Sequence, residues 1–98
     1  MTVESLELIT DVELLERVKS GINLNGNDYQ NDTLSVWIEE VKQDLLHAGV
    51  SVDVANSTLA VGCITRGVDD RWLSHLSDYS DFFNKGVERL RNIKVKGA

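Results

Sequence analysis

The segment from residue 32 to residue 49 places the strongest constraint on how this chain can fold. Its apolar residues recur three and four positions apart, which is the spacing of one face of an α-helix. These residues are Leu34, Ile38, Val41, Leu45 and Ala48. Asp32 can cap the first turn, and Gly49 can adopt the left-handed conformation that ends a helix. We therefore predict an amphipathic helix over residues 32–48, which needs other elements to cover its apolar stripe.

Three further segments show helical periodicity, so the sequence predicts an all-α fold, a small bundle of four main helices. The expected helices span residues 11–20, 32–48, 57–73 and 79–92. Thr10 and Glu13 fit a capping box at the start of the first helix. The third segment contains the most apolar run of the chain, with Gly62 and Gly67 as small residues that allow a close helix approach. We expect it to be the central helix.

The residues between the second and third helices follow a different pattern. Val50, Val52 and Val54 alternate with polar residues, which is the period of a β-strand. Because one strand has nothing to pair with, we expect an extended connector over residues 50–55 whose valines pack against the helices and which can end in a short turn at residues 53–57. A small mixed fold, in which these residues join a sheet, is the alternative.

The chain length favours one compact unit. Its 98 residues are expected to form a single helical domain, 1–98, with a flexible basic tail from about residue 93. A chain of this size builds only a modest core, so self-association is a ready source of further buried surface. Deletion from Asn92 onward is expected to leave the fold intact.

Charge is distributed unevenly along the chain. Residues 1–81 carry five Lys or Arg and 15 Asp or Glu, whereas residues 82–98 carry five and one. The acidic part disfavours ordinary DNA binding, because affinity for a duplex comes largely from cations placed against phosphates. The basic end is suited to an acidic protein surface or is simply a solvated terminus, and the sequence leaves both interpretations open.

No residue pattern indicates chemistry, and we predict neither enzyme activity nor a cofactor or metal. His47 and His75 have no companion at metal-ligand spacing. Cys63 is the only cysteine and lies among apolar residues, so we expect a buried thiol, no internal disulfide and a reducing compartment. Neither a secretory leader nor an apolar run of about 20 residues is evident, so we expect an intracellular protein without membrane contact.

The order of elements from residue 11 to residue 93 also forms a pattern. An opening helix, an Asn/Asp-rich loop, a helix ending at residues 44–50, an apolar third helix and an aromatic-rich last helix follow one another. The residues that carry this pattern are Leu14, Leu15, Val18 and Lys19, then Asp32, then Ile64, Val68 and Trp72, then Phe82, Phe83 and Leu90. In this order the chain resembles the small α-helical head–tail connector proteins of tailed bacteriophages, also described as DNA-packaging or head-completion proteins.

The resemblance implies a structural role without catalysis. Proteins of this family assemble into a ring under the portal of the capsid, extend the DNA channel and offer a docking surface to a stopper or tail protein. It therefore implies a location in the virion at the head–tail junction, after synthesis in the host cytoplasm. The implied partners are the portal protein, a tail-side or stopper protein and further copies of the chain, which can be monomeric in solution.

Two residue groups become candidates for this role. Glu39, Glu40 and Asp44 are candidate channel-facing acidic residues, which would repel DNA phosphates so that the duplex passes without specific binding. The candidate protein interface is the basic and aromatic C-terminal segment, with Tyr79, Phe82, Phe83, Arg89, Arg91, Lys94 and Lys96. The acidic group equally suits a role in solubility alone. A small intracellular helical adaptor or regulatory protein remains the alternative, followed by a helix-turn-helix DNA binder.

Overall fold

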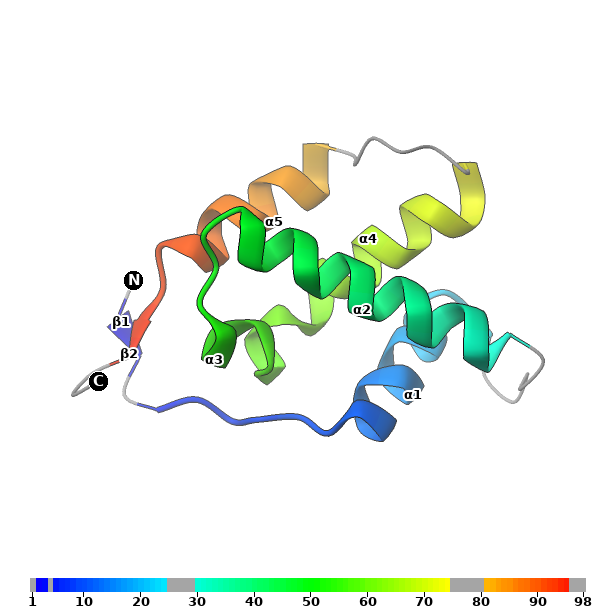
Figure 1. Cartoon of the computed structure of the whole chain (residues 1–98), viewed down its shortest axis with the longest axis horizontal. Coiled ribbons are helices and arrows are strands. Elements are labelled where there is room, and N and C mark those ends of the chain that lie inside the picture. Colours follow the sequence, from blue (N-terminus) through cyan, green and yellow to red (C-terminus); the bar gives the residue numbers. More distant parts are fainter. Residues whose placement is uncertain (1, 4, 25–29, 75–80, 96–98) are drawn as a thin grey trace.

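A computed structural model describes residues 2–3, 5–24, 30–74 and 81–95 of the chain. These residues form a small all-α bundle, as predicted. Its four longer helices are α1 (Asp11–Gly21), α2 (Asn31–His47), α4 (Val61–Ser74) and α5 (Asp81–Arg91). Helix α4 packs against α1, α2 and α5, so it is the central helix of the bundle (Figure 1). The side chain of Trp72, at the end of α4, lies outside the description.

Helix α1 begins where the sequence predicts. The Thr10 hydroxyl accepts a hydrogen bond from the Glu13 backbone N–H at 3.2 Å, which satisfies one of the free donors of the first turn. Leu14 and Val18 then face the core and are fully buried. The helix ends at Gly21, one residue beyond the predicted end.

Helix α2 differs from the prediction at its start and agrees with it at its end. It begins at Asn31, and no side chain caps it, so Asp32 lies in the first turn rather than at the cap. There its carboxylate still faces the positive end of the helix dipole. At the other end Gly49 has a φ of 98°, and the N–H groups of Gly49 and Val50 donate to the carbonyls of Leu46 and Leu45. This is a Schellman motif, which requires the left-handed glycine.

The connector after α2 is not extended over residues 50–55, and this prediction is wrong. Val52–Ala55 forms a helical turn, α3, in which the Ser51 hydroxyl accepts a hydrogen bond from the Val54 N–H at 3.3 Å. The alternation of valines with polar residues indicated an extended segment in which Val52 and Val54 share one buried face. In the structure the buried residues of the turn are Val54 and its neighbour Ala55, whereas Val52 is 60% exposed. The turn therefore buries adjacent residues, which a strand with one buried face does not do.

The segment predicted as the start of the third helix is also more complex. Thr58–Ala60 forms a 3₁₀ turn, η1, before α4 begins at Val61. The buried Ser57 donates its hydroxyl to the Val54 carbonyl at 2.7 Å and accepts from the Leu59 N–H at 3.3 Å. The chain before α1 runs along this region, where the Ile9 N–H donates to the Asn56 carbonyl at 3.0 Å.

The two ends of the described chain meet. Strand β1 (Thr2–Val3) pairs in parallel with β2 (Lys94–Val95), at the end of the molecule opposite the α2 start (Figure 1). Ile93, between α5 and β2, is buried. Residue 93, where the tail was expected to begin, is therefore a core position followed by a strand, and residues 96–98 lie outside the description. Deletion from Asn92 would remove a core side chain and the strand pair, so we no longer expect it to leave the fold intact.

The two glycines of α4 have different surroundings. A Cβ at Gly67 would lie 2.8 Å from Phe83 Cε2 of α5 and 2.9 Å from Val41 Cγ1 of α2. A Cβ at Gly62 would meet nothing within 4 Å. Of the two glycines, Gly67 is therefore the one at which α2 and α5 pack closely against α4, whereas Gly62 faces open space.

We expect Gly62→Ala to stabilise the protein and Gly67→Ala not to stabilise it. Alanine raises helix propensity by about 1 kcal/mol at either position. At Gly67 the overpacking of two buried side chains costs roughly 1–3 kcal/mol, so the net effect is destabilising or at best neutral. Urea unfolding of the two variants tests this, and a Gly67→Ala protein that gains as much stability as Gly62→Ala would contradict the packing described for α4.

Candidate functional site

The acidic candidates lie on α2, and a cation from α4 joins them. Arg71 donates through Nη1 to Glu40 Oε2, and its Nη2 lies 3.5 Å from Asp44 Oδ2. Glu39 instead accepts a hydrogen bond from Gln43 within α2, at 3.4 Å. The three carboxylates are thus brought to one region of α2, where Arg71 partly neutralises two of them.

Arg71 is a site residue that the sequence analysis did not find. It is 27 and 31 residues away from its partners, and only the packing of α4 on α2 brings them together. Its guanidinium can bridge both carboxylates because Glu40 and Asp44 are four residues apart and share a helix face. The pair of acids therefore has a structural use as well as a possible electrostatic one.

The C-terminal candidates divide between the core and the surface. Phe83 is 2% exposed and belongs to the core, so it is not available to a partner protein in this structure. Successive residues of a helix point about 100° apart, which is why its neighbour Phe82 faces outward and is 73% exposed. Arg89, Arg91 and Lys94 are also exposed. The remaining two candidates, Tyr79 and Lys96, lie outside the described residues.

The exposed Phe82 ring has a cation against it. The Arg66 guanidinium of α4 lies 5.4 Å from the ring centroid, within the range of a cation–π contact. Arg66 also lies 3.7 Å from Asp69, one turn further along α4. The aromatic ring is therefore supported by a neighbouring helix although its outer face meets solvent.

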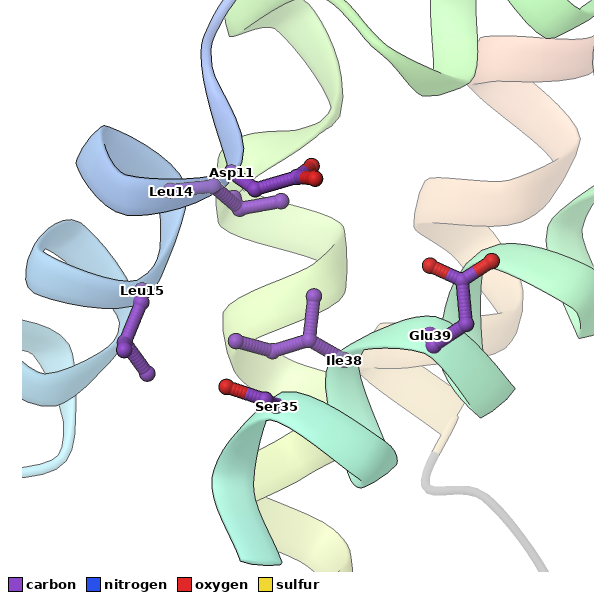
Figure 2. Close-up of a pocket in the computed structure, with 6 residues that line it drawn as sticks. All are labelled: Asp11, Leu14, Leu15, Ser35, Ile38 and Glu39. Carbon is purple, nitrogen blue, oxygen red and sulfur yellow. The ribbon is translucent and has the colours of Figure 1, made fainter. Parts of the chain in front are cut away.

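A pocket of about 300 Å³ opens between α1 and α2. Its lining residues are Asp11, Leu14, Leu15, Ser35, Ile38 and Glu39. Figure 2 shows Ile38 pointing from α2 toward α1, with the carboxylates of Asp11 and Glu39 at one side of the space. The pocket thus has a mixed lining of three apolar residues, one serine and two acidic side chains, and it shares Glu39 with the acidic group on α2.

Lys42 is a buried cation behind this region. It is only 7% exposed although a charged residue usually faces solvent. Its ammonium donates to the Asn56 side-chain carbonyl at 3.0 Å and lies 3.6 Å from Asp11 Oδ1. A buried ammonium requires such partners, because without them the free energy of removing the charge from water would not be compensated. Lys42 therefore ties α2 to the start of α1 and to the end of α3.

The remaining candidates for chemistry occupy ordinary structural positions. His47 is exposed at the end of α2, and His75 lies outside the described residues. Cys63 is buried, and its thiol donates to the Phe83 carbonyl at 3.7 Å. Burial raises the pKa of Cys63 from 9.0 to about 11, although the charge of Arg89 acts in the opposite direction. At neutral pH the thiol is protonated and is a poor nucleophile.

Two searches over the described residues bear on other site types. No three His, Cys, Asp or Glu side chains there are grouped so that they could hold a metal ion. Within the same residues, no helix has both the length and the apolar character that crossing a membrane requires. What the described surface does offer is an apolar pocket with acidic neighbours and an exposed aromatic ring with basic neighbours.

Comparison with known proteins adds no relative to this description. No protein-family model, no curated protein and no solved structure matches the chain.

We expect the stability difference between the wild-type protein and Cys63→Ala to depend on pH. The thiol ionises near pH 9 when the chain is unfolded and near pH 11 when it is folded, so the folded state holds this proton more tightly. The contribution of the buried thiol to the free energy of unfolding is complete below about pH 9, and it is lost as the pH rises toward 11. Urea unfolding across this range should show the two proteins converging, whereas a constant difference would contradict the burial of the thiol.

Proposed function

We propose that the chain is a structural protein of a tailed-phage head–tail junction, which forms a ring under the portal and extends the DNA channel. The observation that best supports this is the separation of exposed groups onto two helices. Carboxylates gather on α2, and an aromatic ring and basic residues are exposed on and after α5. A ring subunit needs two such different surfaces, because it meets a different partner on each side.

In this proposal the α2 carboxylates face the channel. Three carboxylates stand against one guanidinium there, so the surface remains acidic although Arg71 neutralises part of it. An acidic wall repels DNA phosphates, which favours passage of the duplex over binding to it. Glu39 has no ion pair to Arg71 in the arrangement described above, and it also lines the α1–α2 pocket.

The basic residues after Phe82 form the proposed docking surface for the portal. Arg89, Arg91 and Lys94 are exposed and lie within six residues of one another along the chain. Phe83 no longer belongs to this surface because it is buried. Charges of one sign at the exposed edge of an interface chiefly accelerate association and select a partner of opposite charge. We therefore expect the portal protein to present an acidic surface to these residues.

The helix-turn-helix alternative draws no support from the described contacts. Its reading helix would be α4, whose cations are Arg66 and Arg71. Arg66 lies against Asp69 and Phe82, and Arg71 is held by α2 carboxylates. Cations engaged in this way are poorly placed to neutralise phosphates. The intracellular adaptor remains as an alternative, and the following experiment separates it from the connector.

Complementation of phage heads tests the proposal. Heads made without the chain should package DNA but fail to retain it or to acquire tails, and the added full-length chain should restore both. The double variant Arg91→Glu/Lys94→Glu should lower this restoration by at least about tenfold, because it reverses charge on the docking surface and leaves Arg89 in place. Infectious particles are counted in both cases.

The matched control is Arg17→Glu, which reverses an exposed charge on α1. It should restore tail joining as well as the wild-type chain does, because the pair that Arg17 forms with Glu13 is solvent-exposed and contributes little to stability. Heads that retain DNA and join tails without the chain would exclude the connector role. That result is expected if the chain is an adaptor.

A further inference from the structure

We infer that copies of this chain associate head to tail, with Phe82 of one copy seated in the α1–α2 pocket of the next. The inference deepens the proposed function, because it names the contact that would build the ring. It is argued from the chain's own surfaces, and it can be tested on the purified protein without any phage component.

The first observation is the exposed aromatic ring. A phenylalanine that is 73% exposed leaves a large apolar area in water, and burying it against a partner is favourable. Arg66 lies 5.4 Å from the centroid and restrains the ring, so less freedom is lost when a partner covers it. An aromatic ring beside an arginine is also the composition typical of the residues that dominate binding energy at interfaces.

The second observation is the pocket that would receive the ring. Leu14, Leu15 and Ile38 contribute the apolar part of its lining, beside Ser35 and two carboxylates, and its volume of about 300 Å³ leaves space for an aromatic side chain. It is small for a ligand site, since such pockets usually hold about 300–1,000 Å³. A single side chain inserted from another protein is therefore a better match than a large ligand.

Charge complementarity favours a second copy as the occupant. Asp11 is 97% exposed at the side chain although its Oδ1 lies 3.6 Å from the Lys42 ammonium, and together with Glu39 it lines the pocket. On α5, Lys85 and Arg89 follow Phe82 by three and seven residues, which places them on the same side of the helix as the ring. Both are exposed. Insertion of Phe82 would thus bring basic residues of one copy toward acidic residues of the next.

The geometry requires that the contact join different copies. Helices α1 and α5 lie on different sides of the bundle, with α2 and α4 between them (Figure 1). Phe82 therefore cannot fill the pocket of its own chain. A contact in which two different surfaces meet is repeated from copy to copy, and it produces a closed ring or a filament according to the rotation at each step.

Engineered cysteines test the direction of the contact. Ser35→Cys places a thiol in the pocket, and Asp81→Cys places one beside Phe82 while leaving the ring and both cations in place. The native Cys63 is buried and adds little background. At millimolar protein under mild oxidation, a mixture of the two variants should give disulfide-linked dimers at least about tenfold faster than either variant alone.

Two additional variants test the contact itself. Phe82→Ala, added to the Asp81→Cys chain, should lower cross-linking at least about tenfold, because the variant removes the aromatic ring that the pocket would bury. Val52→Ala is the control, since Val52 is similarly exposed at 60% but lies on α3, away from the pocket. It should leave the cross-linking rate unchanged.

Several outcomes would overturn the inference. Equal rates for the mixture and for either single variant would indicate a contact of another symmetry or none, and an undiminished rate with Phe82→Ala would exclude the ring as the docked group. Electron microscopy of the Ser35→Cys/Asp81→Cys double variant should then show rings or filaments after oxidation. Isolated monomers there, or dimers that do not extend, would also contradict head-to-tail association.

The cross-linking experiment and the complementation of phage heads can give different answers. Cross-linking as expected, combined with heads that do not need the chain, would retain the head-to-tail contact and exclude the connector role. Restored tail joining without any cross-linking of this pattern would retain the connector role and exclude this contact.

Discussion

The structure depends on the packing of one central helix against three others. Helix α4 meets α1, α2 and α5, and its side chains contribute to a core shared by all four helices. Gly67 makes this possible where α2 and α5 come closest, because even one methyl group there would lie under 3 Å from Val41 and Phe83. Interiors are packed at the density of organic crystals, so this contact fixes how α2 and α5 sit on α4. The outward faces of those helices follow from it.

The surface is then a consequence of the core. Once Phe83 is fixed beside Gly67, the neighbouring Phe82 has to point outward, and it comes to lie near Arg66 of α4. In the same way, packing of α4 on α2 brings Arg71 to the acidic residues of α2. The exposed ring and the acidic pocket are the features most suited to contact with other copies or other proteins.

The candidate site could be predicted only in part, and the particular residues show why. The acidic group on α2 and the exposed cations near the C-terminus follow from charge and helical spacing, which are local properties. Arg71 and Lys42 could not be assigned from the sequence, because their partners lie on other elements. The choice between Phe82 and Phe83 also depends on which face of α5 meets α4. The α1–α2 pocket exists only once two helices are placed side by side.

The sequence by itself determined the helices and several of their ends. Apolar periodicity, the Thr10 cap and the glycine at residue 49 are signals that act within a few residues, so they hold before any tertiary contact forms. The tertiary structure decided the helical turn at residues 52–55, where two adjacent buried residues outweighed a strand-like alternation, and the β1–β2 pairing of the chain ends. Both depend on contacts between residues distant in sequence, and local spacing carries no information about those contacts.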